Sequence, residues 1–153
     1  MKLFITITLA ALAFPAIAHH SFFGRFDNST SMEMEGTVTE IHWRNPHVHI
    51  FLEVENPDGS MTKWDLESGS PTLMQRAGIP NDAIEEGMTI RVAAWPPLTD
   101  NLEAFATNVL LPDGRELVMQ TGADAKFNDQ FIGDFSYRFR TQGDRSSPEL
   151  GLF

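Results

Sequence analysis

Residues 37–54 read TVTEIHWRNPHVHIFLEV, and this stretch predicts two β-strands joined by a tight turn at Asn45-Pro46. The second half alternates between apolar and polar residues with the period of a strand. One face carries Val48, Ile50, Leu52 and Val54, and the other carries His47, His49, Phe51 and Glu53. A turn at Asn45-Pro46 pairs residue 43 with 48, 42 with 49 and 41 with 50, so Ile41 meets Ile50 on the buried face.

The same register brings three histidines to the outer face of this hairpin. His42 lies opposite His49, and His47 lies diagonally beyond them. Paired side chains in a sheet are about 5 Å apart at Cβ, and diagonal ones are about 7–8 Å apart. The three histidines therefore form either a candidate metal-binding group or a polar stretch of an exposed strand.

The beginning of the chain has the three regions of a secretory signal peptide. Lys2 supplies the positive start, residues 3–14 hold the apolar run, and Ala16-Ile17-Ala18 is an A-x-A cleavage signature. The apolar run is too short to anchor the protein in a bilayer. We therefore expect residues 1–18 to be removed and the mature protein to be periplasmic or secreted, with no membrane span. A buried N-terminal strand or helix is the alternative.

Cleavage after Ala18 would place His19 and His20 at a new N-terminus. The α-amine and the imidazole of one histidine can chelate a metal ion together, and imidazole suits copper, nickel and zinc. His19 and His20 therefore join His42, His47 and His49 as candidate metal ligands. The alternative is that two histidines merely flank a cleavage site.

Charge and cysteine content narrow the function further. The formal charge is −10, and an acidic exported protein is poorly suited to nucleic-acid phosphates or to anionic membranes. The absence of cysteine excludes thiol catalysis and thiolate metal sites. Any metal must then be bound by nitrogen, oxygen or thioether ligands, and we expect no nucleic-acid partner.

The sequence offers little for catalysis. It contains neither a G-x-S-x-G motif nor a glycine-rich phosphate loop. Four acidic residues fall on neighbouring predicted strands, and we interpret them as solvated surface charges: Glu53, Glu55, Asp65 and Glu67. We therefore expect a protein that is not an enzyme.

The remaining pattern predicts a mainly β fold. Strands are expected over residues 32–43, 47–55, 61–67, 88–95, 102–111 and 115–120. A short helix is expected between the third and fourth strands, because Ser70 suits an N-cap, Pro71 the first turn and Gly78 the end. The apolar residues change parity between Val38 and Ile41, which indicates one inserted residue between them, and Gly36 suits a bend or bulge nearby.

This element order matches a small OB-like barrel of five to six strands. A small open β-sandwich is the alternative. We expect the barrel to occupy residues 19–121 and residues 122–153 to form an aromatic-rich tail. The tail aromatics are Phe127, Phe131, Phe135, Tyr137 and Phe139. Such a tail lies across the barrel, reaches a partner or stays mobile.

Several short motifs resemble those of a family of small bacterial exported proteins with a domain of unknown function. The resemblance covers residues 19–120 and rests on His19-His20-Ser21-Phe22, Gly36-Thr37-Val38-Thr39, Trp43-Arg44-Asn45-Pro46-His47, Gly69-Ser70-Pro71 and Pro112-Asp113-Gly114. It implies export and a small β-barrel-like fold, and it implies no established activity. The recurrent histidines of the family correspond to His19, His20 and His47.

The hairpin also has a looser architectural likeness to periplasmic OB-fold copper chaperones, which bind Cu(I) by His and Met beside a Trp. Here Trp43 lies with His47 and His49, and Met32 and Met34 are nearby in sequence, although core packing is the simpler role for both methionines. We expect an exported binding module for copper or another metal. The alternative is an envelope protein-interaction or structural module without metal.

Overall fold

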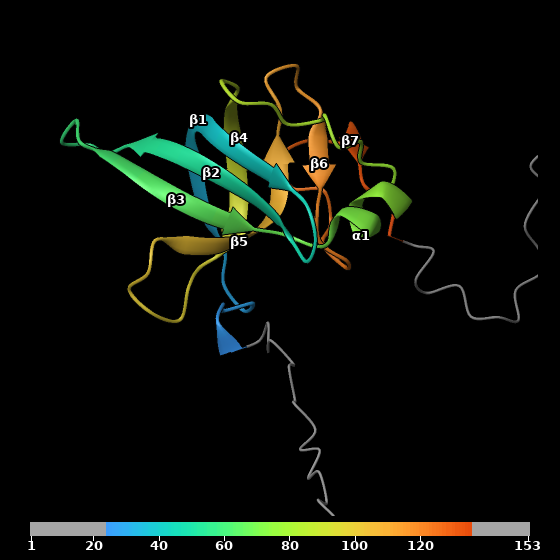
Figure 1. Ribbon diagram of the computed structural model, residues 1–153, viewed down its shortest axis with the longest axis horizontal. Helices are drawn as coiled ribbons and strands as arrows, with labels where there is room; N and C mark the ends of the chain where they lie inside the picture. The colour runs from blue at the N-terminus through green and yellow to red at the C-terminus, as the bar shows by residue number, and fades with distance from the viewer. Residues whose placement is uncertain (1–23, 136–153) are drawn as a thin grey trace, which may run out of the picture.

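The computed structural model describes residues 24–135 (Figure 1). His19, His20, Tyr137, Phe139 and the expected cleavage site lie outside the described residues. The described elements are β1 (Met32–Trp43), β2 (Val48–Glu55), β3 (Met61–Glu67), α1 (Pro71–Arg76), β4 (Thr89–Trp95), β5 (Glu103–Leu110), β6 (Glu116–Val118) and β7 (Phe131–Ile132).

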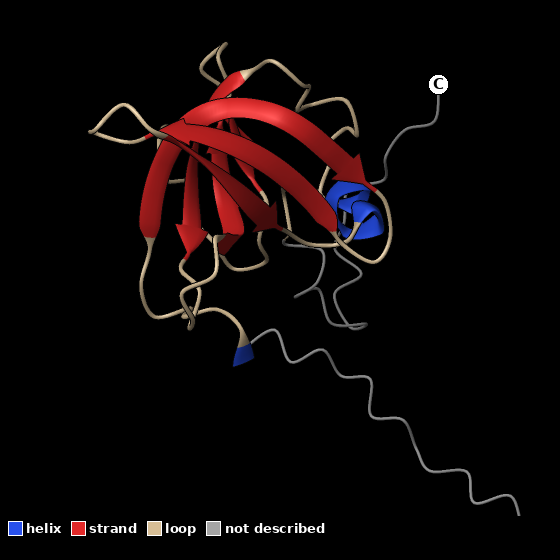
Figure 2. Ribbon diagram, turned by 60° about the vertical axis from the view of Figure 1, so that its left-hand side comes forward, coloured by secondary structure: helices blue, strands red, loops and turns tan. Residues whose placement is uncertain are grey.

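The strands form one sheet in the order β3-β2-β1-β4-β5-β6-β7. A parallel pairing between β3 and β5 closes the first five strands of this order into a barrel. Figure 2 shows the curved strands surrounding the interior, with α1 at one end. The protein is therefore mainly β and OB-like, as predicted, and the closure excludes the open sandwich.

The long strand β1 pairs with two neighbouring strands. Residues 32–37 pair with β4, and residues 37–43 pair with β2. The register with β2 shifts between Val38 and Glu40, so Thr39 is the inserted residue. Gly36 lies beside this change of partner, where an added Cβ would collide with the backbone carbonyl oxygen of Glu53. The predicted insertion is thus present, and the glycine permits the close approach of β2.

The hairpin between β1 and β2 has the predicted register. Trp43 pairs with Val48, His42 with His49, and Ile41 with Ile50. The turn contains a cis peptide bond between Asn45 and Pro46. This register sends one set of β2 side chains into the barrel and leaves the histidines outside.

The barrel interior contains the apolar residues that the strand alternation assigns to it. Ile41 and Trp64 are partly buried and pack against the core, and Met34 is buried within it. The fully or almost fully buried valine, leucine and isoleucine residues of β1–β5 are Val38, Val48, Ile50, Leu52, Leu66, Ile90, Val92 and Val109. Met32 also packs on this core, so both N-terminal methionines serve packing.

The short helix α1 follows its predicted signals. The Ser70 hydroxyl accepts a hydrogen bond from the backbone N–H of Leu73 at 3.3 Å, and Pro71 is the first helical residue. Gly78 follows the helix with φ +84°, a conformation that glycine adopts without strain. Among residues 24–135, no helix is long and apolar enough to cross a membrane.

The described part of the expected tail packs against the end of the sheet beyond the barrel strands. β7 pairs with β6, and Phe135 is buried. The buried carboxylate of Glu116 holds this segment by accepting bonds of 2.6–3.0 Å from the Asn108 side chain and the backbone N–H groups of Lys126, Phe127 and Asn128. Burial opposes ionisation, but these bonds outweigh it and lower the pKa of Glu116.

The substitution Ile50→Ala tests the inward face of β2. Ile50 is fully buried, so we expect the free energy of unfolding to fall by about 2–5 kcal/mol in chemical denaturation. Glu53→Ala on the exposed face of the same strand is the control and should change stability by no more than about 0.5 kcal/mol. Equal, small effects of the two substitutions would show that the assignment of faces is wrong.

Candidate functional site

The three hairpin histidines line one shallow groove on the outside of the barrel. Its cavity volume is about 400 Å³, and its walls are formed by His42, Arg44, Asn45, Pro46, His47, His49, Phe51 and Asp65. The side chains of His42, His47 and His49 are 29%, 33% and 30% exposed. The groove lies over β1, β2 and β3 beside the loop that joins β1 to β2. The prediction that these histidines share one face is confirmed.

His47 and His49 each direct the same ring nitrogen at a carboxylate of β3. Nδ1 of His47 lies 2.5 Å from Oε1 of Glu67, and Nδ1 of His49 lies 2.7 Å from Oδ1 of Asp65. An ionised carboxylate only accepts hydrogen bonds, so these contacts favour the tautomer that carries the proton on Nδ1 in each ring. In the neutral imidazole, Nε2 then keeps the lone pair that can bind a metal ion.

His42 has the opposite arrangement. Its Nε2 lies 2.5 Å from Oε1 of Glu40, and its Nδ1 lies 3.4 Å from a guanidinium nitrogen of Arg44. The proton of the neutral ring is therefore on Nε2, and the lone pair on Nδ1 faces a cationic donor. The hydrogen bond from His42 lowers the pKa of Glu40. Both ring nitrogens of His42 are thus engaged within the protein.

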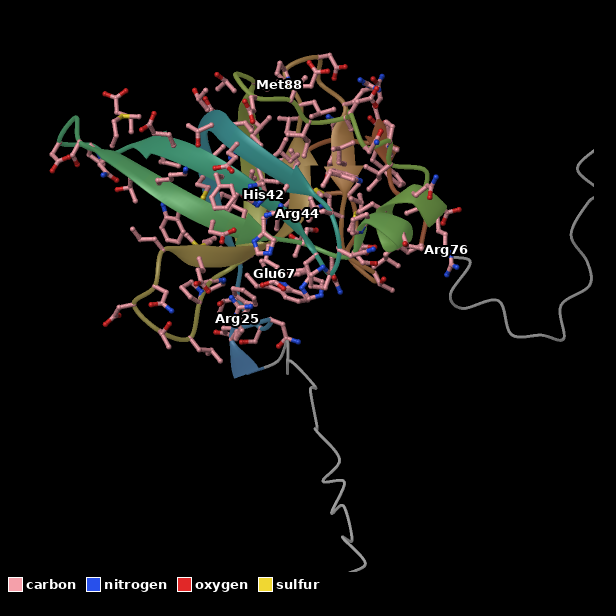
Figure 3. All side chains as sticks on the ribbon, in the orientation of Figure 1. Arg25, His42, Arg44, Glu67, Arg76 and Met88 are labelled. Carbon is pink, nitrogen blue, oxygen red and sulfur yellow. The ribbon has the colours of Figure 1, made fainter. Side chains whose placement is uncertain are left out.

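Glu67 is a buried charge at the centre of the site. Its side chain is only 5% exposed, so the interpretation of Glu67 as a solvated surface charge is wrong. Its Oε2 accepts a hydrogen bond of 2.6 Å from Arg25, whose other terminal nitrogen donates to Glu103 at 2.6 Å. Figure 3 labels Arg25 and Glu67. The bond to Glu103, reinforced by the charge of Glu67, raises the pKa of Arg25 despite the opposing effect of its partial burial. Glu67 therefore has a partner on each carboxylate oxygen.

The segment that carries Arg25 is fixed to the loop between β4 and β5. The Asp27 N–H donates to the Pro96 carbonyl at 2.9 Å, and the Leu98 N–H donates to the Arg25 carbonyl at 2.9 Å. Phe26 between them is buried. These contacts bring the start of the described chain to the carboxylate that also binds the hairpin.

Sequence reasoning missed Arg25 and the role of Glu67. The turn over residues 56–60 pairs Glu55 with Met61, and continuing that register sets Glu67 opposite His49. The turn alone predicts this register between β2 and β3, and the register places the acidic side chains of β3 beside the histidines. Arg25 lies in a polar loop, and no local pattern indicates its partner.

Within residues 24–135, no three histidine or carboxylate side chains form a group that would hold a metal ion. His47 and His49 would supply two Nε2 atoms, which is fewer than the four ligands of a typical zinc site. The other two candidate ligands, His19 and His20, lie outside the described residues.

The sequence matches a family of unknown function (DUF6152) over residues 7–104, which confirms the expected resemblance to an uncharacterised domain. A search of curated proteins gives no match. Among solved structures, the chain is similar to the mitochondrial single-stranded DNA binding protein Rim1 from S. cerevisiae in two crystal forms, at 12% identity in each. The TM-scores are 0.41 and 0.43, and the alignments cover 54% of this chain and 93% and 92% of those chains. At this identity, the likeness concerns the fold alone.

The substitution Arg25→Met tests the dependence of the site on its ion pair. Loss of one partner of a fully buried pair costs about 3–5 kcal/mol, and because Arg25 is 45% exposed we expect about 1–2 kcal/mol. The control is Arg115→Met, which breaks an exposed pair with Asp113 and should leave the stability close to that of the parent. Thermal or chemical denaturation measures both. Equal costs would mean that Glu67 does not need Arg25.

Proposed function

We propose a metal-binding role for this chain, which belongs to the family of unknown function DUF6152. In this proposal the mature protein is an exported module that binds copper through His47 and His49 together with His19 and His20. The observation that carries it is the link from Arg25 through Glu67 to His47, because one buried carboxylate joins the start of the described chain to a hairpin histidine.

The length of the chain supports this arrangement. His20 precedes Arg25 by 25 − 20 = 5 residues. An extended chain spans at most about 3.3–3.6 Å per residue, so five residues cover at most about 16–18 Å, and the proposal requires that this length bring His19 and His20 to His47. The two strand imidazoles would then be supplemented by the imidazole and α-amine of a new N-terminus.

The available donor atoms favour copper. A set of nitrogen ligands without thiolate binds Cu²⁺ most strongly among the divalent first-row ions, with Zn²⁺ next to it in the series. Imidazole binds a metal only in its neutral form, so protons compete with the metal and affinity should fall as the pH is lowered. We propose binding rather than catalysis because the sequence contains no recognisable catalytic motif.

The alternative is an envelope protein-interaction or structural module without metal. Leu98 and Leu102 on the loop between β4 and β5 are 56% and 51% exposed, and this loop is attached to the Arg25 segment. Leu102 also borders a groove with Phe51 and Trp64. Exposed apolar side chains that border a groove favour a protein partner, and the charge of −10 disfavours nucleic acid.

Export can be tested directly. Intact mass of the protein recovered from an exporting host should correspond to a chain that starts at His19, because Ala16-Ile17-Ala18 is the expected cleavage signature. Recovery from the periplasm or medium should accompany that mass. A retained Met1 or a different start would remove the free amine of His19 and with it the proposed chelate.

Copper titration of the processed protein tests the metal site. We expect His47→Ala to weaken binding by about tenfold or more, which corresponds to about 1.4 kcal/mol or more. One alanine added before His19 should weaken binding separately, because it moves the α-amine away from that imidazole. Thr62→Ala on β3 is the surface control. If both variants bind like the parent, the histidines are polar surface and the interaction module becomes the leading function.

A further inference from the structure

We infer that Glu67 and Asp65 are positioning residues that select His47 and His49 as metal ligands through Nε2, whereas His42 is not a ligand. This inference rests on the proposed function, because it assigns roles within the same groove. Beyond the proposed function, it assigns the ring nitrogens that bind the metal ion and the carboxylates that orient those rings. It also identifies the one hairpin histidine that is not a ligand.

His47 directly precedes β2 and His49 lies within it, and both line the same groove. His47 and His49 are separated by one residue, and alternate residues of a strand point to the same face. Val48 between them is completely buried in the barrel, which fixes the direction of its two neighbours. The His-x-His spacing at the start of β2 therefore presents two imidazoles on one outer surface.

The neighbouring strand β3 supplies an orienting group for each ring. Metal-binding histidines almost always donate their other ring N–H to a carboxylate, a carbonyl or water, and loss of such a partner typically weakens metal binding about 10–100-fold. His47 and His49 already have this arrangement, because their Nδ1 atoms face Glu67 and Asp65. Each Nε2 is thus left as the lone-pair donor before any metal arrives.

Glu67 is the more firmly held of the two carboxylates. Its side chain is 5% exposed and accepts a charge-assisted bond from Arg25, whereas the side chain of Asp65 is 34% exposed. A buried, ion-paired carboxylate has little freedom to turn away from the ring that it contacts. We therefore expect His47 to have the better defined orientation.

The surroundings of His42 oppose metal binding. Its ring is engaged at Nε2 by Glu40 and at Nδ1 by Arg44, so a metal would have to displace one of them. The ammonium group of Lys63 also lies 3.7 Å from the second oxygen of Glu40. Two cationic side chains beside His42 raise the electrostatic cost of bringing a metal cation to it.

The donor set also defines the class of ion. Neutral imidazole nitrogens suit copper and zinc, whereas Ca²⁺ and Mg²⁺ require mainly oxygen ligands. The groove should therefore bind Cu²⁺ or Zn²⁺ and not respond to Mg²⁺. Zn²⁺ is the practical probe because it has no redox chemistry and is diamagnetic.

The test begins with ¹⁵N NMR of the histidine rings in the processed full-length chain without metal. We expect His47 and His49 to carry the proton of the neutral ring on Nδ1, and His42 to carry it on Nε2. Adding Zn²⁺ should shift the Nε2 signals of His47 and His49 and leave the ring signals of His42 in place. Reversed tautomers, or a metal-dependent shift at His42, would overturn the inference.

Zn²⁺ affinity of three carboxylate variants completes the test. Glu67→Gln and Asp65→Asn should each weaken binding by about 10–100-fold, and Glu40→Gln is the matched control and should leave affinity within about twofold. Thermal unfolding of each variant checks the fold. If Glu67→Gln is unstable, the Asp65→Asn variant still tests the inference, because Asp65 is more exposed. If the parent binds neither Zn²⁺ nor Cu²⁺, the proposed function fails together with the ligand assignment. If the parent binds and all three variants bind equally well, only the inference fails.

Discussion

The site depends on one buried carboxylate, that of Glu67. A charge that is removed from water must be compensated by hydrogen-bonding or ionic partners. Arg25 and His47 supply them, one at each oxygen. Because these partners come from the N-terminal segment and from the first hairpin, the need to satisfy Glu67 fixes both against β3. The same interaction that stabilises this junction also orients a potential metal ligand.

The barrel was predictable because its determinants are local. The turn at Asn45-Pro46 and the alternation along β2 define the hairpin register, and Ser70 with Pro71 defines the helix start. The parity change along β1 indicates an inserted residue, but any position between Val38 and Ile41 satisfies it. Its location at Thr39 depends on where the pairing of β1 changes from β4 to β2, which is a property of the assembled sheet.

The segment after β6 and the partners within the site were harder to predict because they depend on long-range contacts. Glu116 binds three backbone N–H groups, and backbone donors have no signature in the sequence. Arg25 meets Glu67 across 42 residues of chain. The shared face of His42, His47 and His49 follows from the register alone, whereas the protonated nitrogen of each ring depends on the acid that it faces.

The fold places the imidazoles of His47 and His49 beside carboxylates of β3, and Arg25 contacts one of those carboxylates. The most direct measurement is a crystal structure of the processed protein grown with Zn²⁺, with the ion located by its anomalous scattering. We expect one ion about 2.0–2.1 Å from Nε2 of both His47 and His49, with a nitrogen of His19 or His20 among its other ligands. Glu67 and Asp65 should remain on the Nδ1 atoms. An empty groove, or an ion bound through His42 instead, would contradict the proposed metal site at His47 and His49.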